Sequence, residues 1–217
     1  MDPDAQAARF FNEFSNAFDS FYDGQRSAPM QWIDRHFRSD MFIRFGRTFE
    51  VLGHLAGASV LDIGCGSGVY AAEALRRGAA KVTAIDPAPN MLKLVQERIE
   101  RAGFAGSCEI LEGLFPKLQP PCHDYAIVMG VMDYVRDAAA FLQALRTVTR
   151  VCAAVSFPSY HWFRTPVRRA RYWVRRCPVY FYDAARIQSL GEGADFSAVE
   201  IFKIPGAGMD YHVCLRP

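Results

Sequence analysis

The strongest structural signal in this sequence is the stretch Val60-Leu61-Asp62-Ile63-Gly64-Cys65-Gly66-Ser67-Gly68. An apolar run enters a turn with glycine at every second position, and a helical pattern of residues follows from 68 to 77. Glycine lacks a Cβ atom and tolerates positive φ, so a ligand can approach the backbone of such a turn closely. The amino end of the following helix then offers free N–H groups to that ligand.

A second apolar run, Val82 to Ile85, ends on an acidic residue, Asp86. A carboxylate at the end of the strand that follows a glycine turn can accept hydrogen bonds from both hydroxyls of a ribose. Together, the turn and the acid predict a nucleoside site on a doubly wound α/β sheet. The spacing argues against two common nucleotide sites. The turn reads G-x-G-x-G and not the dinucleotide pattern G-x-G-x-x-G, and it lacks the Lys-Ser or Lys-Thr of a P-loop.

The turn resembles motif I of the class I S-adenosylmethionine-dependent methyltransferases. The segment Asp86-Pro87-Ala88-Pro89-Asn90-Met91-Leu92 resembles the second motif of the same family. The resemblance covers residues 40–157, and the flanking segments are not diagnostic. It implies S-adenosylmethionine as the methyl donor, S-adenosylhomocysteine as the product, no metal, and a seven-stranded sheet whose last strand is antiparallel.

Strands that alternate with helices along the chain indicate βαβ units, a mostly parallel sheet and helices on both of its faces. We expect one domain over residues 1–217, with an N-terminal helical lid at 1–40 and a basic helical insert at 158–182 after the fifth strand. The expected strands are 59–63, 81–85, 107–111, 125–129, 151–157, 197–204 and 210–215, and the expected helices from residue 40 onward are 40–55, 68–77, 90–102, 138–148 and 183–190.

The resemblance also implies which residues hold the cofactor. The glycines would let its methionine part lie against the backbone, Asp62 would orient its amino group, and Asp86 would accept the ribose hydroxyls. In the alternative interpretation, Asp62 only caps the turn and Asp86 only ends a strand. The complete implied set is Arg44, Asp62, Gly64, Cys65, Gly66, Gly68, Asp86, Pro87, Met91, Gly113, Leu114, Met129 and Gly130.

Three further members of this set have a competing interpretation or depart from the family pattern. Met91 would cover the adenine ring, or it would fill the core as a buried methionine. Leu114 stands where the family often has an acid that reads the adenine amino group, so this contact would fall to backbone groups and packing. Arg44 would pair with the cofactor carboxylate, or it would be a solvated helix arginine.

Candidate catalytic residues are His161, Tyr22 and Asp133. Methyl transfer requires alignment of donor and acceptor, and it requires a base only where the accepting group must lose a proton. His161 has the neutral-range pKa of such a base, although a surface or helix-start histidine is the simpler interpretation. Asp133 would orient an acceptor, while Tyr22 would lie in a lid over the methyl group or simply pack.

Residues 162–186 contain seven arginines and a single acid, Asp183, beside several aromatic side chains. A solvated surface helix is the default interpretation of such a charge run. In a second interpretation, the segment would bind an acidic acceptor. In a third, it would lie on a membrane surface and take a lipophilic acceptor such as a quinone or porphyrin precursor. In a fourth, it would stack on RNA. Because the net charge is only +2 and no appended RNA-binding module is recognisable, we expect no nucleic-acid partner.

We therefore expect a methyltransferase that acts on a hydroxyl or carboxyl oxygen of a small molecule. A small-molecule N-methyltransferase and a non-catalytic S-adenosylmethionine-binding protein are the alternatives, and the oligomeric state stays open. The six cysteines are scattered without a C-x-x-C pair, and we recognise no secretory signal and no apolar run near the roughly 18 residues of a membrane span. These features predict a cytoplasmic protein without a metal.

Overall fold

The computed structural model describes residues 39–160, 179–205 and 210–217. The predicted N-terminal lid, with Tyr22, lies outside these residues except for its last two positions. Residues 161–178, which include His161 and most of the predicted basic insert, also lie outside them.

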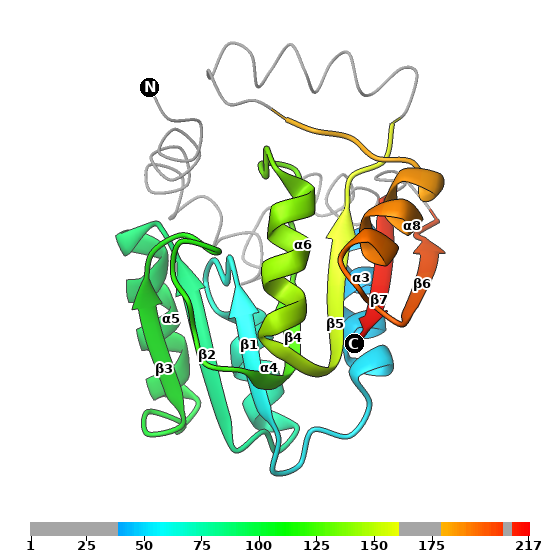
Figure 1. Ribbon diagram of the computed structural model, residues 1–217. Helices are drawn as coiled ribbons and strands as arrows, with labels where there is room; N and C mark the ends of the chain where they lie inside the picture. Colours follow the sequence, from blue (N-terminus) through cyan, green and yellow to red (C-terminus); the bar gives the residue numbers. More distant parts are fainter. Residues whose placement is uncertain (1–38, 161–178, 206–209) are drawn as a thin grey trace, which may run out of the picture.

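One sheet of seven strands forms the centre of the fold, in the order β3-β2-β1-β4-β5-β7-β6 (Figure 1). The strands β1 to β5 run parallel, and β7 lies antiparallel between β5 and β6. The predicted doubly wound, mostly parallel sheet is confirmed, including its antiparallel last strand. The strand bounds are β1 Ser59–Ile63, β2 Lys81–Asp86, β3 Cys108–Glu112, β4 His123–Val128, β5 Thr149–Phe157, β6 Ala198–Lys203 and β7 Tyr211–Arg216.

Helices cover both faces of the sheet (Figure 1). Alternate residues of the strands point to opposite faces, so Leu61 and Ile63 of β1 join one buried cluster while Val60 joins the other. This double burial explains why the strands read as nearly continuous apolar runs. On one face lie α3 (Ser39–Leu52), α4 (Val69–Arg76) and α5 (Pro89–Arg101), and on the other lie α6 (Ala138–Thr147) and α8 (Ala184–Gly193).

The starts of the helices differ in a way that concerns the site. Asp137 begins α6 by accepting a hydrogen bond from the N–H of Ala140 at 3.0 Å, and Asp183 caps α8 through the N–H of Arg186 at 2.7 Å. By contrast, α4 begins at Gly68, whose φ is 76°, and no side chain caps it. The first N–H groups of α4 therefore have no side-chain acceptor at the cap position.

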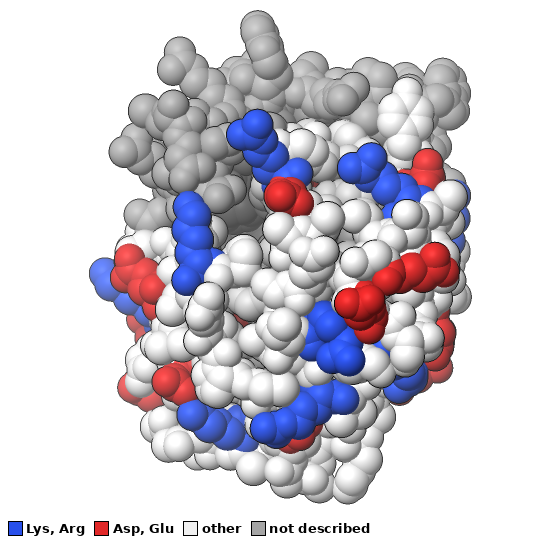
Figure 2. Space-filling view, viewed as in Figure 1, with Lys and Arg blue, Asp and Glu red and all other residues white. Residues whose placement is uncertain are grey.

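On the face that α6 and α8 cover, acidic and basic side chains are interspersed with uncharged ones (Figure 2). This even distribution gives that face no strongly charged character. Among the residues that the structure describes, no helix is long and apolar enough to cross a membrane.

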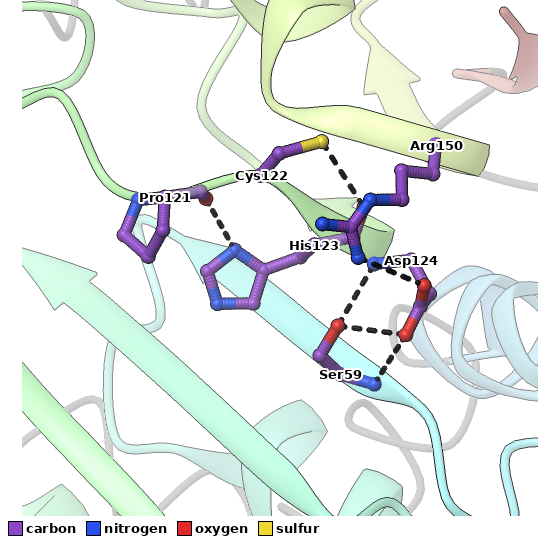
Figure 3. Close-up of polar contacts among 6 residues, drawn as sticks. All are labelled: Ser59, Pro121, Cys122, His123, Asp124 and Arg150. Carbon is purple, nitrogen blue, oxygen red and sulfur yellow. Dashed lines mark hydrogen bonds and ion pairs between the residues drawn. The ribbon is translucent and has the colours of Figure 1, made fainter.

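At the amino edge of the sheet, a carboxylate joins β1 to β4 (Figure 3). Asp124 Oδ2 accepts hydrogen bonds from the N–H and the hydroxyl of Ser59, at 2.8 and 2.7 Å, and Ser59 Oγ accepts the N–H of Asp124 at 3.0 Å. The hydrogen bonds from Ser59, together with Arg150, hold the pKa of Asp124 below its usual value. This reciprocal contact fixes where β1 begins relative to β4.

We predict that Asp124→Ala lowers the free energy of unfolding by about 1–2 kcal/mol, because Ser59 loses two hydrogen bonds to a charged acceptor. Since the folded-state pKa of Asp124 is depressed, its contribution is complete above the ordinary aspartate pKa and is lost as the pH falls through the folded value. Urea titrations at neutral and acidic pH measure the difference. Arg150→Ala is the control, because its 3.4 Å ion pair is exposed and should contribute less than about 0.5 kcal/mol. Equal effects of the two substitutions would contradict the assignment.

Candidate functional site

The loops at the carboxyl ends of β1 to β4 carry nearly all of the predicted site residues. Parallel strands present their carboxyl ends at one edge of a sheet, so the fold brings these loops together. The residues contributed are Asp62, Gly64, Cys65, Gly66 and Gly68 from β1 and the turn after it, Asp86, Pro87 and Met91 from β2 and α5, Gly113 and Leu114 from the loop after β3, and Met129, Gly130 and Asp133 from the loop after β4.

Asp86 is the junction of three of these loops. Its Oδ2 accepts the N–H of Gly66 at 3.0 Å and its Oδ1 accepts the N–H of Ala88 at 2.9 Å. Its backbone carbonyl accepts the N–H of Gly113 at 3.1 Å. A carboxylate has about four lone-pair positions, so two more remain for other donors. The acid therefore shapes the glycine turn, a role that the sequence did not reveal.

The three glycines of the turn are required for three different reasons. A Cβ atom on Gly64 would collide with the side chain of Val131, and one on Gly68 would lie 3.0 Å from Val95 of α5. The first glycine thus lets the loop after β4 pack on the turn, and the last lets α4 pack on α5. Of these three glycines, only Gly66, with φ of 52°, is a position where an added Cβ would meet no heavy atom of the described residues within 4 Å. Its backbone is therefore open with respect to the described part of the chain.

Asp62 lies at the bottom of this turn and is 1 % exposed. Within the described part of the chain, its Oδ2 atom is buried and has no hydrogen-bond partner. Burial raises the pKa of Asp62 to about 7, against a smaller opposing effect from the N–H of Ala71. Burial likewise raises the pKa of Asp86 to about 6, opposed by the N–H groups of Ala88 and Gly66. Two carboxyl groups that are unfavourably desolvated therefore border the turn.

The loop after β4 is held from the neighbouring strand. Ser156 of β5 accepts the N–H of Gly130 at 2.7 Å, and Gly130 has a φ of 75°. No heavy atom of residues 39–160, 179–205 or 210–217 would lie within 4 Å of a Cβ at this position. Asp133 is buried, and its carbonyl accepts the N–H of Tyr180 at 2.9 Å. The backbone of this loop is thus fixed by β5 through Ser156, and at Gly130 it is open with respect to the described residues.

Ser159 and Tyr182, on either side of segment 161–178, lie next to each other at this edge of the sheet. Ser159 forms a parallel bridge with Tyr182, and the N–H of Tyr182 donates to the carbonyl of Pro158 at 2.9 Å. The hydroxyl of Tyr182 reaches the carbonyl of Met132 at 3.3 Å. Both ends of the segment 161–178 are therefore anchored at the carboxyl edge of the sheet.

Three predicted residues need separate comment. Arg44 lies on α3, one turn before Thr48, whose hydroxyl donates to the Arg44 carbonyl at 2.8 Å. Met91 is 1 % exposed, which fits the packing alternative, and its role toward adenine stays a prediction. Leu114 is half-buried in the loop beside Gly113. The roles that the resemblance implies for these residues stay predictions.

Sequence reasoning missed Ser156 and Thr48, which support the loop after β4 from β5 and α3. They are ordinary buried residues in the sequence, and no motif or spacing marks them. Among the described residues, no group of three or more His, Cys, Asp or Glu side chains is arranged to hold a metal ion.

Comparisons with known proteins bear on this edge of the sheet. A family model described as a methyltransferase domain matches residues 60–154. A ubiquinone biosynthesis O-methyltransferase of Methylocella silvestris is 34% identical over 101 residues, which cover 44% of this chain and 37% of that protein. A ribosomal protein L11 methyltransferase of Edwardsiella ictaluri is 42% identical over 66 residues, which cover 30% of this chain and 22% of that protein.

A solved structure has the same fold over the whole chain. The magnesium protoporphyrin IX methyltransferase of Synechocystis PCC 6803, with bound SAH, superposes with a TM-score of 0.80 at 18% identity and covers 100% of both chains. Both curated relatives are matched over less than half of their own length. The family match identifies residues 60–154, from β1 into β5, as a methyltransferase domain, and the solved structure shows that the chain shares its fold with a methyltransferase.

Proposed function

We propose that the chain binds S-adenosylmethionine at the carboxyl edge of β1 to β4 and transfers its methyl group to an oxygen atom of a small molecule. One observation carries the proposal: the open backbone at Gly66 is held by the buried carboxylate of Asp86, which keeps lone pairs for further donors. A flat, open backbone beside a carboxylate suits a nucleoside with two vicinal hydroxyls.

The described residues fit this cofactor. Asp62 Oδ2 is a buried acceptor without a hydrogen-bond partner among the described residues, and an ammonium group would satisfy it. Asp86 would accept the ribose hydroxyls, and the guanidinium of Arg44 would pair with the cofactor carboxylate. When bound, S-adenosylmethionine supplies a methyl group that is already activated by its sulfonium charge. The work of the chain is then to orient donor and acceptor and to exclude water.

The acceptor would lie against the loop after β4 and the anchored ends of segment 161–178. Asp133 is buried there beside Tyr180 and Tyr182. Of the three candidate catalytic residues, it is the one that the structure describes, and it would orient an acceptor hydroxyl. His161 and Tyr22 remain proposals for the base and the lid. Seven arginines between residues 162 and 186 favour an acceptor that carries acidic groups or lies near an anionic surface.

Oxygen as the accepting atom has one further support. The relative from Methylocella silvestris is named as an O-methyltransferase of ubiquinone biosynthesis, and its alignment is longer than that of the relative named for a ribosomal protein. A small-molecule N-methyltransferase and a non-catalytic binding protein are the alternatives that the acceptor experiment below separates.

We predict that S-adenosylhomocysteine raises the melting temperature of the wild-type protein and that Asp86→Ala abolishes this shift. Loss of two hydrogen bonds to a charged acceptor should weaken binding by at least about 30-fold in a calorimetric titration. Because Asp86 also holds Gly66 and Ala88, Asp86→Asn, which keeps the side-chain volume, is measured beside it.

Glu109→Ala is the matched control, because this acid lies on the neighbouring strand β3 and pairs with Lys81. It should bind S-adenosylhomocysteine with wild-type affinity. Absence of any shift in the wild-type protein would overturn the cofactor assignment.

The pH dependence of binding should have a definite sign. We predict that the Kd for S-adenosylhomocysteine is constant above about pH 8 and rises as the pH falls through about 7 and 6, where Asp62 and Asp86 take up protons. Protonation of each carboxyl group should weaken binding by up to about tenfold for each pH unit below its pKa. Asp62→Asn should remove the component near pH 7, and equal affinities at about pH 8 and about pH 5.5 would contradict the assignment.

The stability of the ligand-free protein should show the opposite trend. Both carboxyl groups have higher pKa values in the folded state than their ordinary value of 3.8. The folded state therefore holds more protons than the unfolded state between these values, so stability falls as the pH rises through this window. Urea titrations of the wild type and Asp62→Asn measure the effect, which should be smaller in the variant.

The acceptor is tested by turnover on a panel of phenols, carboxylic acids and primary amines, with S-adenosylhomocysteine formation as the readout. We predict activity on an oxygen acceptor, and that Asp133→Asn lowers kcat by at least about tenfold without changing the Kd for S-adenosylhomocysteine. Asp137→Asn, an exposed cap of α6 four residues further on, is the control and should keep the wild-type kcat. Turnover only on amines would favour the nitrogen alternative, and binding without any turnover would favour the non-catalytic one.

A further inference from the structure

Four side chains form a buried polar layer between α3 and the sheet, directly beneath the loop after β4. Thr48 comes from α3, Met129 from the end of β4, Ser156 from β5 and His212 from β7, with exposures of 0, 9, 2 and 1 %. Ser156 and His212 are cross-strand partners in the β5–β7 pair. None of these residues belongs to the motifs of the family resemblance, apart from Met129.

The hydrogen bonds of this layer fix the tautomer of His212. The hydroxyl of Thr48 has one proton, and its closest acceptor is the carbonyl of Arg44 at 2.8 Å, whereas the sulfur of Met129 lies at 3.7 Å. A carbonyl can only accept, so the hydroxyl donates to it and must act as the acceptor in its 3.1 Å contact with His212 Nε2. His212 therefore carries its proton on Nε2 and donates to Thr48.

His212 is a neutral donor at physiological pH. Burial, and then the charges of Arg47 and Arg44, lower the pKa of His212 to about 4. The guanidinium of Arg47 lies 4.6 Å from the ring centre of Phe202, which is the partner of His212 on β6. A positive charge on His212 is therefore disfavoured, and its ring stays uncharged.

This layer touches two parts of the proposed cofactor site. The carbonyl that Thr48 holds belongs to Arg44, the proposed partner of the cofactor carboxylate. Because α3 leads to the amino end of β1, Arg44 lies one helical turn closer than Thr48 to the carboxyl edge, or about 5.4 Å. On the other side, Thr48 contacts Met129, and Ser156 holds the N–H of Gly130.

We propose that His212 is a positioning residue of the cofactor site, which acts through Thr48 to hold α3 in register with the end of β4. The inference rests on the proposed function, since it assumes that Arg44 and the loop at Gly130 face the cofactor. His212 itself contacts neither donor nor acceptor. Its contribution is to keep two binding elements, which come from distant parts of the chain, at a fixed separation.

The test removes the hydrogen-bond donor at position 212 by substitution and measures the Kd for S-adenosylhomocysteine. His212→Leu removes the donor and should weaken binding by about tenfold, the loss expected for one buried hydrogen bond. His212→Gln places an amide N–H near the position of Nε2 and should restore binding to within about threefold. In steady-state assays, His212→Leu should raise KM for S-adenosylmethionine more than it lowers kcat.

Cys214→Ala is the matched control, because Cys214 is 2 % exposed, lies on the same strand and face two residues further on, and is outside the polar layer. It should lower the melting temperature but keep the wild-type Kd. If His212→Leu does not fold, Thr48→Val tests the same link with an isosteric side chain and should weaken binding by the same factor.

Three outcomes would overturn the inference: wild-type affinity in the variant that removes the link, equally weak binding in His212→Leu and His212→Gln, or equal weakening in Cys214→Ala. A wild-type protein that does not bind S-adenosylhomocysteine would instead refute the proposed function, so the two failures are distinguishable.

Discussion

The carboxylate of Asp86 accepts N–H groups from the turn after β1 and from the loop after β2, and the shape of the carboxyl edge depends on these contacts. Through Gly66 it sets the course of the glycine turn, and through its own carbonyl it holds Gly113 after β3. A buried acid would be costly if its oxygens were unsatisfied, and the backbone donors reduce that cost. One side chain therefore shapes the turn and still has lone pairs for further donors.

The same edge shows a compromise between stability and binding. Asp62 and Asp86 are both buried, and burial raises the pKa of each carboxyl group. A buried acceptor without a partner destabilises the ligand-free fold, and a ligand with matching donors would relieve it. Strain of this kind is typical of binding sites, because the groups are arranged for the complex and not for the free protein.

The two halves of the carboxyl edge are built differently. Around β1 and β2, the hydrogen bonds of the Asp86 carboxylate to Gly66 and Ala88 shape a surface within one continuous stretch of the chain. Around β4 and β5, residues distant in sequence hold the loop instead, among them Ser156, Thr48 and Tyr182. Tyr180, which follows segment 161–178, donates its N–H to the carbonyl of Asp133 at this loop.

The sequence by itself determined the fold class, the bounds of the described strands and helices to within three residues and the glycine turn after β1, because hydrophobic periodicity and the glycine spacing are local signals. It also indicated that Asp86 ends a strand at the site. Only the tertiary structure decided why Gly64 and Gly68 are needed. A Cβ atom at these positions would meet the side chains of Val131 and Val95, which lie far along the chain. Likewise, His212 reaches Thr48 across 164 positions. Such contacts depend on how α3 and β7 pack on the sheet, and no local pattern in the chain encodes that geometry.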